Sequence, residues 1–172
     1  MTLQFYNYLK RLAEYELKSK MSNSLGLTLN EFKDRWNTKA ESFPNLFKNI
    51  VEKNNNESDF QIKLDESIIL MGNVINHNSE KIIKNITMIA SGDGSFISGV
   101  NILTSIGTLI DCINPYEDVE FRKKLMDKLG VMDPEMDKGS TILVNEIKYT
   151  FKLSKQIGVW LSISRNTTDG EK

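Results

Sequence analysis

The hydrophobic pattern of the chain is dominated by one uncharged stretch that ends at Asp111. Over residues 95–113 the apolar side chains recur at helical spacing. They form two adjoining stripes, one of Phe96, Val100, Leu103 and Ile110 and the other of Ile97, Ile106, Leu109 and Ile113. A helix that is apolar on most of its sides must be covered by other elements. Residues 95–113 are therefore predicted to form the central helix of the fold, with Ser95 as its N-cap.

Helical spacing and helix-start signals recur on both sides of this stretch. Thr28 and Glu31 match a capping box, in which a hydroxyl and a carboxylate each bond a free backbone amide, and Ser58 with Gln61 matches a second one. Asn114 is predicted to cap a helix that stops at Gly130. The predicted apolar faces are Leu29, Phe32, Trp36 and Ala40 after the first box, and Phe60, Leu64, Ile68, Met71 and Ile75 after the second. Further helices are predicted over residues 3–20, 44–51 and 79–90.

The segment from Thr141 to Ile163 carries two competing patterns. Ile147, Tyr149, Phe151 and Leu153 alternate with polar residues as they would in a strand. Lys148, Lys152 and Lys155 nevertheless line up at helical spacing, opposite an apolar stripe. A helix over residues 141–163 is preferred here to strands.

Together these patterns predict an all-α fold. The expected architecture is a compact bundle of about seven or eight helices around residues 95–113. A chain of 172 residues fits a single domain, assigned to residues 1–164. Residues 165–172 are predicted to be a disordered tail.

Composition limits the classes of partner and the compartment. The 22 basic and 23 acidic residues give a net charge of −1, so the chain exerts no general pull on nucleic acid or anionic membranes. Cys112 is the sole cysteine and there is no signal peptide pattern, which predicts a reducing, cytoplasmic location. The uncharged stretch is too short and too interrupted by polar residues for a membrane span. Abundant Lys, Asn and Ile suggest a low-GC bacterium or its phage as the source.

One short string, SGDGSF over residues 91–96, invites a catalytic interpretation. If residues 86–90 formed a strand, Asp93 would lie at its carboxyl end, where open α/β sheets bind ligands. The string resembles the SGDxDF motif of NYN/PIN-type nucleases, and Asp59 and Asp65 are spaced like two upstream acidic positions of that family. The resemblance implies that Asp65 and Asp93 hold a divalent metal for phosphodiester cleavage. Ser95 departs from it, because it occupies the place of the second aspartate. The string is also similar to the GGDGT loop of lipid and NAD kinases. The preferred interpretation is a turn between two helices.

The sequence offers few other candidates for catalytic, metal-binding or ligand-binding residues. His77 is the sole histidine, so a pair with Cys112 is the one available arrangement of a thiol nucleophile with a histidine base, and nothing in the spacing favours it. No spacing supports a metal site, and no cofactor is predicted. We assign no catalytic residue. Lys148, Lys152 and Lys155 are the candidate binding residues, for phosphate or for an acidic partner. No aromatic residue is expected among solvated basic ones, which argues against binding of single strands.

The preferred function is therefore a non-enzymatic helical interaction protein, a small regulatory or accessory subunit that acts through protein–protein contacts. Its partner is unknown. Small residues at four-residue spacing, Ser91, Ser95 and Gly99, would also suit a homodimer contact. The alternatives are an atypical or degenerate metal-dependent nuclease of the NYN/PIN type, and a nucleic-acid-binding protein that uses the C-terminal lysines. No membrane association is predicted.

Overall fold

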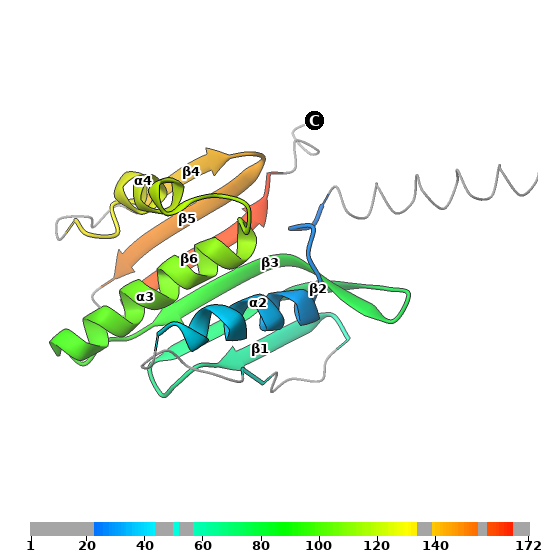
Figure 1. The fold of residues 1–172 in the computed structure, drawn as a ribbon, viewed down its shortest axis with the longest axis horizontal. Helices are drawn as coiled ribbons and strands as arrows, with labels where there is room; N and C mark the ends of the chain where they lie inside the picture. Colours follow the sequence, from blue (N-terminus) through cyan, green and yellow to red (C-terminus); the bar gives the residue numbers. More distant parts are fainter. Residues whose placement is uncertain (1–22, 44–49, 52–56, 134–138, 155–157, 167–172) are drawn as a thin grey trace, which may run out of the picture.

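A six-stranded antiparallel sheet forms the framework of the part of the chain that the structure describes (Figure 1). The structure, a computed structural model, describes residues 23–43, 50–51, 57–133, 139–154 and 158–166. The strands are β1 (Asp59–Lys63), β2 (Ile68–His77), β3 (Glu80–Ala90), β4 (Ser140–Val144), β5 (Ile147–Ser154) and β6 (Gly158–Arg165). The helices are α2 (Leu29–Glu41), α3 (Phe96–Ile113) and α4 (Val119–Leu129), and all three lie on the same face of the sheet.

The sheet consists of two three-stranded meanders joined edge to edge. Its strand order is β1-β2-β3-β6-β5-β4, so the last strand of each meander pairs with the last strand of the other. This junction sets Thr87 opposite Ser162 and Ile89 opposite Trp160. Helices α3 and α4 connect the two meanders along the chain, while α2 precedes the first. Strands far apart in sequence thus become neighbours at the centre of the sheet.

The predicted all-α bundle is wrong. Residues 59–63, 68–77 and 80–90 form strands where helices had been predicted, and the expected helix over residues 141–163 is replaced by β4, β5 and β6. The predicted capping box of Ser58 is absent, because Ser58 instead leads into β1 and its carbonyl accepts a hydrogen bond from the Val74 amide. Apolar residues such as Ile69, Met71 and Ile89 also occupy the outward positions of β2 and β3, so the two-residue alternation is filled in and imitates a helical pattern.

Period-two burial is the pattern that the tertiary structure uses in these segments. Phe60, Ile62 and Leu64 are buried in alternation, as are Ile68 and Leu70. The β2–β3 and β4–β5 hairpins turn on residue pairs with positive φ, Asn78–Ser79 and Asn145–Glu146. Two-residue turns of this kind match the twist of paired strands and favour Asn at the first position. The two Asn-led turns were the local strand signal that the helical interpretation missed.

The predictions for α2 and for the extent of α3 are confirmed. Helix α2 begins with the capping box of Thr28 and Glu31 and buries the four residues of its predicted apolar face. Helix α3 spans residues 96–113 with Ser95 as N-cap. Helix α4 ends at Gly130, whose φ of 69° is the left-handed conformation expected of a C-cap glycine. Its N-cap is Asp118 and not the predicted Asn114.

Helix α3 is only half covered, contrary to its predicted central place. Residues from Ile102 to Ile113 supply its buried side chains, whereas Phe96, Ile97 and Val100 are exposed. In Figure 1 the N-terminal turns of α3 project beyond the sheet at the lower left. By length and composition α3 could cross a membrane, alone among the described helices, but half of it is buried inside the fold. The predicted helices over residues 3–20 and 44–51, and the predicted tail, lie wholly or mostly outside the described residues.

Candidate functional site

The face of the sheet that carries no described helix is the broadest candidate surface. Strand pairing aligns its side chains in rows that cross the sheet. One row runs Lys63, Ile69, Ile89, Trp160 and Lys152; the next runs Gln61, Met71, Thr87, Ser162 and Thr150; the third runs Asp59, Asn73, Asn85, Ser164 and Lys148. All of these side chains are partly or fully exposed. We call this surface the open face.

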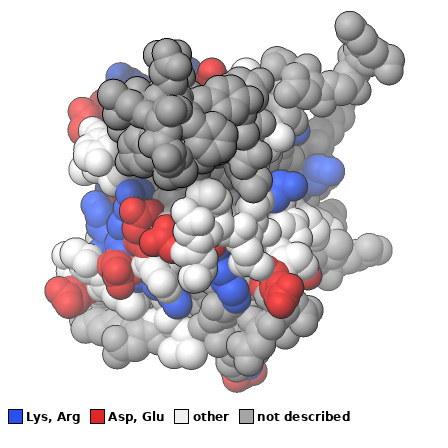
Figure 2. Space-filling view, turned by 90° about the vertical axis from the view of Figure 1, so that its right-hand side faces the viewer, with Lys and Arg blue, Asp and Glu red and all other residues white. Residues whose placement is uncertain are grey.

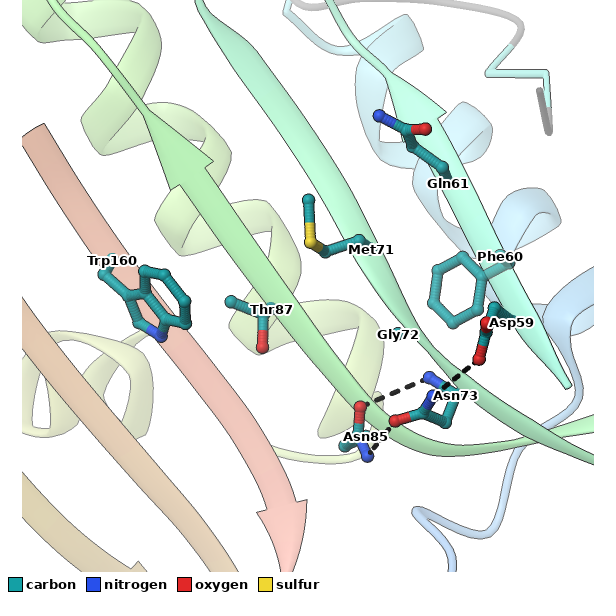
Figure 3. Close-up of a pocket in the computed structure, with 9 residues that line it drawn as sticks. All are labelled: Asp59, Phe60, Gln61, Met71, Gly72, Asn73, Asn85, Thr87 and Trp160. Atoms are coloured by element: carbon teal, nitrogen blue, oxygen red, sulfur yellow. Dashed lines mark hydrogen bonds between the residues drawn. The ribbon is translucent and has the colours of Figure 1, made fainter. Parts of the chain in front are cut away.

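A hollow of about 370 Å³ lies on the open face, over β1, β2, β3 and β6 (Figure 3). At one end a hydrogen-bonded chain crosses three strands: the Asn73 side-chain amide donates to Asp59 Oδ1 at 2.7 Å, and the Asn85 amide donates to Asn73 Oδ1 at 3.0 Å. At the other end stands Trp160, with Thr87 and Met71 between them. The hollow therefore offers fixed amide and carboxylate groups at one end and an aromatic ring at the other.

The predicted binding lysines lie on this face as far as they are described. Lys148 and Lys152 project from β5 and are exposed, while Lys155 lies outside the described residues. Lys152 is directly opposite Trp160 across the β5–β6 pair, and the Trp160 side chain is 37% exposed. The expectation that no aromatic residue would lie among solvated basic ones is thus wrong. It failed because strand pairing, and not the sequence, brings Lys152 and Trp160 together.

The two aspartates of the nuclease alternative lie at the same end of the sheet. Asp65 is in the β1–β2 turn and Asp93 in the loop after β3, and the two segments are joined by the Ser91 amide, which donates to the Ser67 carbonyl at 2.8 Å. The string SGDGSF connects strand β3 to helix α3, so the predicted turn between two helices is wrong.

Both carboxylates are engaged by their own turns. Asp65 Oδ1 accepts hydrogen bonds from the Ser67 amide at 2.6 Å and from the Ile68 amide at 2.7 Å. Asp93 Oδ1 accepts one from the Ser95 amide at 2.8 Å. Hydrogen bonds from the Ser95 side chain and backbone lower the pKa of Asp93. Within the described residues no three acidic, histidine or cysteine side chains are grouped closely enough to hold a metal ion.

The Cys112 thiol and the His77 imidazole lie on different elements of the fold. His77 ends β2, where its Nε2 lies 3.1 Å from the Asn78 side-chain amide. Cys112 is buried in the last turn of α3, and burial raises the pKa of its thiol to about 12. A thiol that keeps its proton at neutral pH is a poor nucleophile. The structure thus brings no nucleophile and base together from this pair.

The exposed end of α3 is a second candidate surface. Phe96 is 85% exposed, Ile97 69% and Val100 41%, although each is large and apolar. The stripe of Phe96 and Val100 continues through Leu103, which lines a groove of about 240 Å³ between α3 and α4. Ser95 and Gly99 lie beside the bulky residues, and no atom lies within 4 Å of the place that a Gly99 side chain would take. We call residues 95–100 the apolar end of α3.

The described surface carries both acidic and basic side chains, without a large patch of one sign in the view of Figure 2. Figure 2 shows acidic and basic side chains interspersed over the described part of the face that it presents.

Comparisons of the chain with protein-family models, with curated proteins and with solved structures each gave no match. The functional argument therefore depends on the two surfaces themselves.

Proposed function

We propose that this chain is a non-enzymatic interaction protein that works as a homodimer and makes its contact through the apolar end of α3. The observation that carries the proposal is the exposure of Phe96, Ile97 and Val100 on turns that project from the body of the fold. Burying large apolar side chains against a partner stabilises a complex by the same effect that stabilises a core. Contiguous apolar surface on a projecting helix is typical of a protein contact.

The order of large and small residues supports a second copy as the partner. In a twofold antiparallel pairing of two helices, residue i of one copy lies opposite residue j of the other, and j opposite i. If the two copies cross between Ile97 and Ser98, Phe96 faces Gly99 and Val100 faces Ser95. Each bulky side chain then meets a small one, which allows close packing of the two backbones. The helix has no charged residue before Asp111, so the two copies do not repel each other there.

The test measures the molar mass of the intact chain in solution by light scattering at several concentrations. The wild type is expected to be a dimer. Gly99→Glu should give a monomer, because it places two like charges at the contact. The same change should leave the fold intact, since Gly99 faces open space and Glu suits the first turns of a helix.

Two further variants complete the comparison. Phe96→Ser should also give a monomer, because it removes the largest side chain of the contact. Tyr116→Ser is the matched control: Tyr116 is equally exposed but lies between α3 and α4, so its loss should leave the dimer unchanged. A monomeric wild type would contradict the proposal, as would a Gly99→Glu variant that remains dimeric.

A further inference from the structure

A second hollow, of about 360 Å³, lies beside the first on the open face. Its lining residues include Lys84, Lys148 and Arg165, together with Asn85, Ser164 and Asn166. Arg165 is ion-paired with Glu146. Among the described carboxylates none forms an ion pair with Lys84 or Lys148, and both lysines are exposed. The hollow is therefore a cationic site whose two lysines can meet an anion.

A β-bulge in the sheet determines the position of Lys84, one of these cations. In the β2–β3 pairing Asn73 is opposite Asn85, but the next residue, Val74, is opposite Ile83. Lys84 therefore has no residue opposite it on β2. Such a bulge interrupts the strict alternation of side chains and often re-aims one of them at a binding site. Gly72 adjoins the bulge, and a methyl group there would lie 2.0 Å from the Asn85 carbonyl oxygen. Glycine at position 72 is thus required for the backbone that presents Lys84 and Asn85 together.

The two hollows meet at Asn85, which lines both. Together they form a track along the open face from the cationic hollow, past Thr87, to Trp160. On β6 the track runs from Ser164 to Trp160, a distance of ~13 Å at roughly 3.3 Å per strand residue. Beyond the two hollows, Lys152 lies opposite Trp160. The negative group on this face that lines the track is Asp59, which is bonded to Asn73.

We propose that this track binds single-stranded nucleic acid, with phosphates at Lys84 and Lys148 and a base stacked on Trp160. A cationic groove combined with an exposed aromatic ring is the arrangement that single strands recognise. The separation of the two ends exceeds the reach from a phosphate to its own base, so the track fits a strand of several nucleotides and not a mononucleotide. A duplex is disfavoured, because its bases are stacked on each other and cannot reach an indole on a shallow sheet face.

The fluorescence of Trp160 also provides a way to measure binding. Of the two tryptophans, Trp36 is fully buried on the inner face of α2 and Trp160 is exposed. Quenching of the intrinsic fluorescence by a bound base therefore reports on Trp160. Titration of the full chain with short labelled single-stranded RNA and DNA, by fluorescence quenching and by anisotropy, should show binding that weakens as salt is raised. The same sequence as a duplex should bind more weakly than either single strand.

Variants separate stacking from charge. Trp160→Ala should weaken binding by roughly ten- to a hundredfold, the usual effect of losing one stacked base, and Trp160→Phe should restore part of it. Lys148→Glu should weaken binding and flatten its dependence on salt. Lys123→Glu, an exposed lysine on α4 away from the sheet face, is the matched control and should change neither.

Competing anions decide between the possible partners. Polyglutamate and vesicles that contain phosphatidylserine serve as the comparison ligands. Equal binding of polyglutamate or vesicles, with no effect of Trp160→Ala on any ligand, would show a merely electrostatic surface and overturn the proposal. Failure of both single-stranded ligands to bind at low salt would overturn it as well. Because the track lies on the open face and not on α3, the monomeric Gly99→Glu variant tests it independently of the dimer.

Discussion

At the scale of single residues, the fold sets the chemistry of two buried ionisable groups. Burial raises the pKa of the Cys112 thiol to about 12. Burial also raises the pKa of Tyr149 to about 12, although its hydroxyl is bonded to the Asn114 side chain at 2.8 Å. Both groups stay protonated in the folded chain at pH values where the unfolded chain would ionise them. Their contribution to stability therefore depends on pH only in the alkaline range.

The direction of this pH dependence follows from the difference in proton binding between the folded and unfolded chain. The unfolded chain loses the Cys112 proton near the ordinary thiol pKa of 9.0, while the folded chain keeps it to about 12. The stabilisation by this group is complete below pH 9 and is lost as the pH rises toward 12. The contribution of Cys112 to the free energy of unfolding should then fall by up to ~1.4 kcal/mol per pH unit in this range. Denaturant titrations of wild type and Cys112→Ala from about pH 8 to about pH 11 should show profiles that converge as pH rises; a constant difference would contradict the prediction.

At the scale of elements, α3 has two halves with different environments. From Ile102 onward its apolar side chains pack against the rest of the core, and Ile106 is fully buried. The first turns extend beyond the sheet and keep Val100 partly exposed. The same uncharged sequence pattern therefore covers a core segment and a surface segment. Only contact with the neighbouring elements separates them.

A matched pair of substitutions tests this division. In the monomeric Gly99→Glu background, where no second copy covers this end of the helix, Val100→Asp should change the melting temperature little, because the carboxylate can reach water and lies in the N-terminal half of a helix. Ile106→Asp should lower the free energy of unfolding by several kcal/mol, because it buries an unpaired charge. Thermal melts followed by circular dichroism provide the measurement. Equal damage by both variants in that background would show that the N-terminal turns of α3 are covered within a single copy of the chain.

At the scale of the whole molecule, one acidic side chain connects the three described helices. Asp111 of α3 forms ion pairs with Lys39 of α2, at 3.4 Å, and with Arg122 of α4. Its side chain is only 13% exposed, so solvent screens these pairs less than it screens a surface pair. Arg35 of α2 adds a hydrogen bond of 2.9 Å to the Cys112 carbonyl at the end of α3. These contacts fix the three described helices relative to one another.

Removing this charge should loosen the helical layer. Asp111→Asn is expected to lower the free energy of unfolding by ~1–2 kcal/mol, because two cations lose a charged hydrogen-bond partner. Asp127→Asn, on the exposed side of α4, is the control and should change stability by less than ~0.5 kcal/mol. Urea denaturation of both variants measures the difference. A destabilisation by Asp127→Asn as large as that by Asp111→Asn would contradict the assigned role.

The candidate surfaces could be predicted only in part. Lys148 and Lys152 are exposed, but they lie on a strand and not on the predicted helix, and their role in binding stays a prediction. Trp160 was missed, because its value as a binding group comes from its register with Lys152 across β5 and β6. Lys84 was missed because a bulge, which no local pattern marks, places it beside Asn85. The apolar end of α3 was expected to be core, since exposure depends on where the sheet ends.

The sequence by itself determined the elements whose signals are local. The capping box of Thr28, the N-cap Ser95 and the C-cap Gly130 are each satisfied within a few residues, so α2, α3 and the end of α4 followed from the pattern. The tertiary structure alone decided that residues 59–90 and 140–165 are strands, because a strand is stable only when a partner satisfies its backbone groups. β3 finds one of its partners in β6, where Asn85 pairs with Ser164 and Ala90 with Val159, and no local spacing encodes that pairing.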